Sequence, residues 1–86
     1  MNKNDLIAIV KNKLNNEFVI EQVDIEDKSF LHKNHQGNQE GKFHLKLTIR
    51  SNELKNLTKI ESSKKVYKVL RKEMSEYIHS LQILIT

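Results

Sequence analysis

The chain of 86 residues contains no cysteine, no proline and only two glycines. Without cysteine it cannot form a disulfide, a thiol nucleophile, a CxxC redox pair or a zinc ribbon. For the same reason it cannot hold an iron–sulfur cluster by itself through four thiolates. The scarcity of glycine and proline also excludes collagen-like and linker-rich chains.

Charge and hydropathy are moderate. Fifteen Lys and Arg against eleven Asp and Glu give a net charge of +4, which permits an anionic partner without requiring one. No stretch approaches the roughly 18 apolar residues of a membrane span, and the apolar run 6–10 is too short for the core of a signal peptide. We therefore expect a cytoplasmic protein with no membrane contact and no small-molecule substrate. The apolar content suffices for one small core, which predicts a single domain over residues 1–86.

Hydrophobic periodicity predicts one helix and two strands in the first half of the chain. Asn15-Asn16 should end the helix, whose apolar positions recur at helical spacing. β-Branched and alternating residues predict a strand over 18–26. A second strand is expected over 43–50, where apolar and polar residues alternate strictly. Between them, the polar segment 27–42 holds both glycines and predicts a long hairpin loop.

The second half of the chain predicts a helix and a third strand. Thr58 and Glu61 fit a capping box, and the helix should continue to about Glu76. At Ile78 the period changes from 3.6 to 2, so a strand follows in which His79 shares one parity with Leu81, Ile83 and Ile85. Because the helix is a crossover, this strand should lie parallel to a neighbour. The order α-β-β-α-β predicts an α+β fold, with a three-stranded mixed sheet and helices on one face.

Four histidines are candidates for binding chemistry. His32 and His35 form an H-x-x-H pair in the long loop, His44 begins the second strand, and His79 begins the last one. Imidazole binds Zn, Fe and Cu, and a loop can meet the start of a strand in space. Ordinary surface histidines, or a hydrogen-bonded structural histidine at position 79, fit the same spacing.

No catalytic centre is indicated by the remaining polar residues. Ser62 and Ser63 lie at a helix start and are expected to be solvated. Asp24, Glu26 and Asp27 lie at the end of a strand, where solvated carboxylates are a simpler interpretation than acid–base chemistry. There is no glycine-rich phosphate loop. We therefore expect a protein that is not an enzyme.

A basic stripe along the long helix offers a second hypothesis. Lys64, Lys68, Arg71 and Lys72 fall at i, i+4, i+7 and i+8, and Lys65 flanks them. Such a stripe can follow a phosphate backbone and would give salt-dependent binding. A solvated helix face explains the pattern as well. Aromatic residues do not interleave with the stripe, so base stacking is not supported.

The ordered set of motifs resembles the BolA family. It comprises IEDKSFLH at 25–32, HLKLTIRS at 44–51, VY at 66–67 and IHSL at 78–81, and the resemblance covers about residues 4–85. It implies a class II KH-like fold, with a short extra helical turn before the long helix, and so a single BolA-like domain.

The resemblance also implies a function. BolA-like proteins pair with monothiol (CGFS-type) glutaredoxins, and the two proteins share a bridging 2Fe–2S cluster together with glutathione. The family's near-invariant ligand falls on His79. The second ligand comes from the loop and falls most naturally on His32, with His35 as the competitor. His44 takes a structural or apo-interface role, and the isolated chain should hold no cluster.

One departure from the family pattern bears on the alternative function. Where the family usually has Arg-His-Arg at the start of the long helix, this chain has Ser62-Ser63-Lys64. That region is implicated in nucleic-acid binding in the family. A DNA-binding transcriptional regulator, using Lys64, Lys65, Lys68, Arg71 and Lys72, therefore ranks second to the glutaredoxin partner.

Overall fold

The computed structural model describes residues 2–28 and 43–86. Its elements are α1 (Lys3–Glu17), β1 (Gln22–Asp27), β2 (Phe43–Arg50), α2 (Asn52–Lys55), α3 (Lys59–Val69), α4 (Arg71–Glu76) and β3 (Ile78–Ile85). The predicted order α-β-β-α-β is confirmed, and α2 is the short extra turn before the long helical segment.

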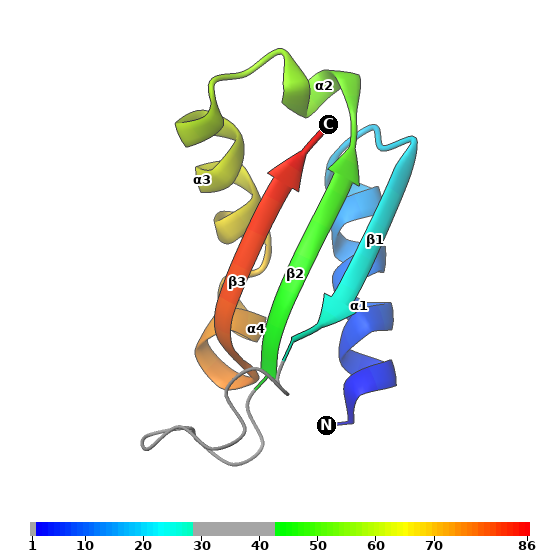
Figure 1. Ribbon diagram of the computed structural model, residues 1–86, viewed down its shortest axis with the longest axis vertical. Helices are drawn as coiled ribbons and strands as arrows, with labels where there is room; N and C mark the ends of the chain where they lie inside the picture. Colours follow the sequence, from blue (N-terminus) through cyan, green and yellow to red (C-terminus); the bar gives the residue numbers. More distant parts are fainter. Residues whose placement is uncertain (1, 29–42) are drawn as a thin grey trace.

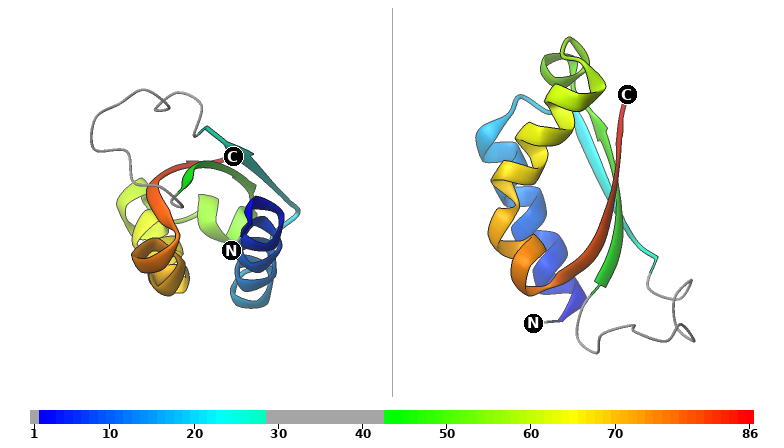
Figure 2. Two further views of the ribbon diagram at one scale, coloured as in Figure 1. Left: turned by 90° about the horizontal axis from the view of Figure 1, so that it is seen from below. Right: turned by 90° about the vertical axis from the view of Figure 1, so that its left-hand side faces the viewer.

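The three strands form one sheet in the order β1-β2-β3. β1 pairs with β2 antiparallel, whereas β2 pairs with β3 parallel, so the predicted mixed sheet is confirmed. The helices pack on one face of this sheet (Figures 1 and 2). The segment α2–α4 forms the crossover that returns the chain to a strand parallel to β2.

The core lies between the sheet and the helices. In β2 the apolar residues alternate with polar ones, and Leu45, Leu47 and Ile49 are buried. They pack in one cluster with residues from the helices and from β3: Leu6, Val10, Leu14, Leu54, Val66, Leu70, Ile78 and Leu81. The alternation expected for this strand is therefore confirmed as a helix-facing apolar side and an opposite polar side.

The first helix is longer, and the first strand shorter, than the sequence predicts. Asn15 does not end the helix, because its side-chain amide donates to the Lys11 carbonyl oxygen at 3.0 Å. The backbone N–H of Phe18 still donates to the Leu14 carbonyl oxygen at 3.0 Å. Phe18 therefore caps α1 and packs against the core instead of starting a strand, and β1 begins at Gln22.

The predicted single helix from Thr58 to Glu76 is divided at Leu70. The predicted capping box between Thr58 and Glu61 is confirmed at its start. Leu70 takes φ −97° and ψ 16°, outside the helical region, while its side chain is fully buried. Its N–H donates to Val66 and its carbonyl accepts from Met74, so both backbone groups stay paired across the break. The prediction of one continuous helix is wrong, because the backbone of Leu70 leaves the helical region while its side chain stays in the core.

The prediction that Ser62 is solvated is wrong. Only 2% of the residue is exposed, because it lies on the face of α3 that is turned toward the core. Its hydroxyl donates to the Lys59 carbonyl oxygen at 3.1 Å, so the buried oxygen is satisfied within its own helix. Ser63 is half-buried.

An ion pair joins α4 to α1. Glu73 of α4 is buried, and both of its carboxylate oxygens accept from the Lys13 ammonium group, at 2.9 and 2.7 Å. The Lys13 side chain keeps 38% of its surface exposed. The carboxylate is therefore the partner that depends on this contact, because it has little access to water.

Replacing Lys13 by Ala should destabilise the fold by about 1–3 kcal/mol, because a buried carboxylate then loses its charged donor. Urea unfolding measures the loss. Lys11→Ala, an exposed change on the same helix, is the control and should stay within about 0.5 kcal/mol of the original chain. When Glu73 is already replaced by Gln, Lys13→Ala should lower the free energy of unfolding by a smaller amount. An equal loss in both backgrounds would show that the pair contributes nothing.

Candidate functional site

The start of β3 contains a bulge, and His79 is its extra residue. In the parallel ladder Phe43 faces Ile78, but the next residue of β2, His44, faces Ser80. Ile78 and Leu81 are both buried, whereas the two residues between them are exposed. The predicted parity, with His79 on the same face as Leu81, is therefore wrong. The bulge turns His79 to the face of the sheet opposite the helices.

His44, His79 and Ser80 form a small cluster on that face. Nδ1 of His44 lies 2.7 Å from the Ser80 hydroxyl oxygen, which is hydrogen-bond distance. The ring centroids of the two histidines lie 4.9 Å apart, and the ring planes are tilted by 55°. His44 is only 4% exposed, whereas His79 is exposed. A buried, hydrogen-bonded imidazole therefore forms the wall against which an accessible imidazole packs.

Strand alternation and the register of β2 with β3 explain why these three residues meet. His44 lies on the polar side of β2, because Phe43 and Leu45 face the core. Ser80 is its register partner on β3, and the hydroxyl of Ser80 limits the rotation of the His44 ring. The sequence alone gave no signal for the contact between Ser80 and His44, since it depends on the register of two strands far apart in the chain.

The loop histidines lie outside the described residues. His32 and His35 fall within 29–42, so the ligand roles that the sequence predicts for them stay predictions. Within 2–28 and 43–86, no three His, Cys, Asp or Glu side chains come together as a metal site. Of the predicted iron ligands, the structure thus places His79, exposed and next to His44.

The carboxylates of β1 fit the simpler of the two interpretations, in which they lie on a solvated strand. Glu26 lies 2.9 Å from the Lys28 ammonium group. The hydrogen bond and the charge of Lys28, together with the charge of Lys46, hold the pKa of Glu26 below its ordinary value despite a small opposing effect of burial. A carboxyl group with a lowered pKa stays ionised near neutral pH and is poorly suited to be a general acid.

The predicted basic residues are exposed, but they do not form one helical stripe. Lys64, Lys65 and Lys68 belong to α3, whereas Arg71 and Lys72 follow the break and belong to α4. The structure instead gathers most of them around two hollows beside α1.

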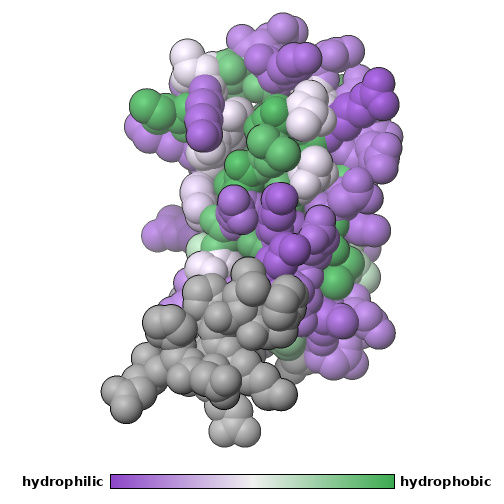
Figure 3. Space-filling model, in the orientation of Figure 1, coloured by the Kyte–Doolittle hydropathy of each residue, from purple (hydrophilic) through white to green (hydrophobic). Residues whose placement is uncertain are grey.

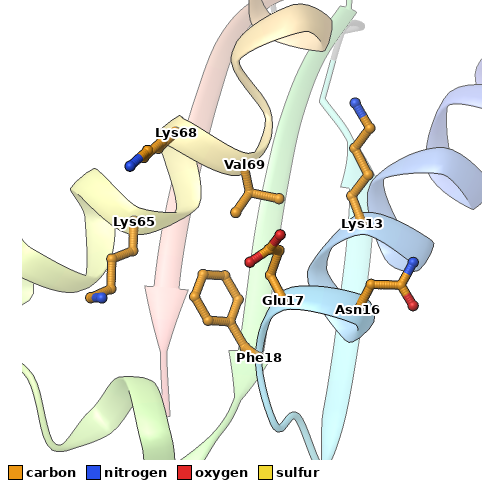
Figure 4. A pocket seen from close by; sticks show the side chains of 7 residues that line it. All are labelled: Lys13, Asn16, Glu17, Phe18, Lys65, Lys68 and Val69. Atoms are coloured by element: carbon orange, nitrogen blue, oxygen red, sulfur yellow. The ribbon is translucent and has the colours of Figure 1, made fainter.

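The first hollow, of about 510 Å³, lies between α1 and α3 (Figure 4). Lys13, Lys65 and Lys68 line it together with Phe18 and other residues. The second, of about 480 Å³, also includes Lys13 and Lys68 and adds Arg71 and Lys72. The sequence pattern does not indicate Lys13 as part of this group, because its proximity to α3 depends on helix packing. Lys64 lines neither hollow.

Ser80→Ala should remove the hydrogen bond to His44 and cost about 0.5–1.5 kcal/mol of stability, measured by urea unfolding. The same change should shift the imidazole NMR signals of both His44 and His79, because their rings are in contact. Ser80→Thr keeps the hydroxyl and serves as the control. Unchanged His79 signals in Ser80→Ala would contradict the coupling of the two rings.

Comparison with solved structures identifies the fold. The BolA domain of SufE1 from Arabidopsis thaliana matches with a TM-score of 0.78 at 22% identity, covering 100% of this chain and 93% of that one. BolA1 from Arabidopsis thaliana matches with a TM-score of 0.78 at 24% identity, covering 93% of this chain and 88% of that one. The predicted small α+β fold is thus confirmed as the fold of BolA domains.

Comparison of sequences identifies the family. The family model described as BolA-like protein matches residues 14–86. The DNA-binding transcriptional regulator BolA of Haemophilus influenzae is 31% identical over 75 residues, which cover 87% of this chain and 70% of that protein. In the described part of the chain, none of the helices has the length and apolar character needed to span a membrane. The chain belongs to the BolA family.

Proposed function

We propose that this chain is the partner of a monothiol glutaredoxin and contributes histidine ligands to a bridging 2Fe–2S cluster, in cluster assembly, trafficking or iron regulation. The observation that carries the proposal is the exposed imidazole of His79, turned outward by a strand bulge and packed against the buried His44. Family membership supports it, since pairing with such glutaredoxins is what the BolA resemblance implies.

The donor set of the chain fits one side of a mixed cluster site. His79 is exposed, and no described residue hydrogen-bonds its ring nitrogens, so they are accessible to iron. The chain has no cysteine, so both thiolates must come from the glutaredoxin and from glutathione. His32 is the proposed second ligand from this chain, with His35 as its competitor.

The chemistry that such a cluster supplies depends on its ligands: neutral imidazole in place of thiolate makes it less negative and raises its reduction potential. The residues of this chain hold the imidazole in place. The backbone of β3 fixes His79 at the bulge, His44 packs against its ring, and Ser80 orients His44. We infer that His79 is a fixed ligand whose position changes little when a partner binds.

Mixing the chain with a glutaredoxin that carries its 2Fe–2S cluster should change the visible absorption and circular dichroism spectra. His79→Ala should abolish this change, while Gln82→Ala, an exposed change on the same strand, should leave it intact. His32→Ala and His35→Ala, titrated in parallel, identify the loop ligand. An unchanged spectrum with the original chain, or the same change with His79→Ala, would contradict the proposal.

A DNA-binding regulator is the second candidate function. The relative from Haemophilus influenzae is named a DNA-binding transcriptional regulator. The observation in this chain that favours the same role is the set of cations around the two hollows beside α1: Lys13, Lys65, Lys68, Arg71 and Lys72. Side chains of Lys and Arg gathered from three helices can contact successive phosphates.

In this candidate function, Lys68→Glu should weaken DNA binding and reduce the salt dependence of log affinity by about one unit of slope. Band shifts or anisotropy at a series of salt concentrations around ~150 mM measure both effects. Lys3→Glu makes the same charge change at the far end of α1 and should have a smaller effect. Absence of binding at micromolar protein in ~150 mM salt would argue against this function.

A further inference from the structure

A groove lined by cations runs beside α1 on the helical side of the molecule. The two hollows described above share Lys13 and Lys68, so they adjoin and form one surface, which we call the basic groove. Lys65 of α3 lines the first hollow, and Arg71 and Lys72 of α4 line the second. Residues from three helices thus contribute to the basic groove.

Most of the positive charge of the basic groove is not neutralised by neighbouring carboxylates. Lys13 donates to the buried Glu73, so its charge is paired. Within the described residues the other four cations form no ion pair, and all four are exposed. The acidic residues that line the hollows are Glu17 and Glu76. Four exposed cations against two carboxylates leave the groove positive, which attracts a chain of negative charges.

An aromatic side chain lies among these cations. Phe18 ends α1 and lines the first hollow together with Lys65 and Lys68. It is half-buried and packs against the core, so its ring is held in place. In Figure 4 the ring turns one face to the viewer, with Lys65 and Lys68 on the α3 side of it. The structure therefore supplies the surface for base stacking that the basic residues of the long helix, taken alone, do not indicate.

We propose that the basic groove binds single-stranded DNA, with an unpaired base stacked on Phe18 and the phosphates along the cations of α3 and α4. The proposal rests on the second candidate function, DNA binding, and names the form of DNA that the groove takes. A positively charged groove combined with an aromatic stacking surface is how proteins bind single strands without reading their sequence. Glu17 repels phosphate from the α1 side, so the backbone follows the opposite wall.

A double helix fits this arrangement less well. Its bases are paired and stacked inside the duplex, so a base reaches Phe18 only after it has been unpaired and unstacked, which costs free energy. A single strand incurs much less of this cost. Duplex DNA can still contact the exposed cations through its phosphates. We therefore expect both forms to bind, with a preference for the single strand.

The opposite face of the sheet is less suited to a phosphate chain. The exposed carboxylates Asp24 and Glu26 of β1 lie on it, because the residues that alternate with them pack against the core. Figure 3 shows this face, with hydrophobic residues gathered over the upper half of β3, where Leu84 is 48% exposed. His79 is also on this face, so DNA in the basic groove leaves the proposed cluster ligand accessible.

Fluorescence anisotropy with a labelled single strand, and with the duplex of the same sequence, tests the proposal. The single strand should bind about tenfold more tightly than the duplex. Phe18→Leu keeps an apolar side chain at the core but removes the ring, and should raise the Kd for the single strand about tenfold. Its salt dependence should stay unchanged, because no phosphate contact is lost. Val23→Ala is the control for packing, since Val23 also packs against the core but lines neither hollow, and should leave the Kd unchanged.

A strand of the same length in which abasic sites replace the bases isolates the stacking on Phe18. It keeps the phosphates and lacks the bases, so the original chain and Phe18→Leu should bind it equally. An equal loss for the complete and the abasic strand would show that Phe18 acts only through the fold, and would overturn the proposal. Duplex binding as tight as single-strand binding would overturn it too, while DNA binding as such would stand. Absence of binding to either form at micromolar protein in ~150 mM salt would overturn both.

Discussion

The side chains of β2 alternate between the core under the helices and the opposite face of the sheet. The parallel pairing of this strand with β3 holds the side chains on both faces in place. Leu45, Leu47 and Ile49 face the helices and form the centre of the core. His44, directly before Leu45, faces the opposite side and is buried against Ser80 and His79. The core thus fixes the strand that also positions the candidate ligand, so changes that disturb this pairing should affect stability and ligand geometry together.

β3 has different roles along its length. At its start the bulge exposes His79 on the sheet face and leaves the neighbouring Ser80 to bond His44. Toward its end, the strand lacks the charges that protect β1, and Leu84 is exposed. β3 therefore carries an exposed imidazole near its start and an exposed leucine near its end.

The candidate functions occupy opposite sides of the sheet. The helices cover one face (Figure 2), and the cations that line the hollows between α1 and α3 belong to that side. His79 lies on the other face. Lys13 serves both stability and this basic surface, because it pairs with the buried Glu73 and also lines both hollows. If replacing Lys13 weakens DNA binding, the stability of that variant must therefore be measured as well. This control matters less when Lys68 is replaced.

The sequence by itself determined the order of helices and strands, the alternation of β2, the capping box at Thr58 and the family. These features depend on neighbours within a few residues, and local periodicity expresses them directly. Only the tertiary structure decided which face His79 occupies, where the long helix breaks and which cations gather around Lys13. The bulge at His79 depends on the register with β2, and the break at Leu70 coincides with a side chain that is fully buried in the core. The contact between α1 and α3 depends on helix packing, and in each case the residues that meet lie far apart in the chain.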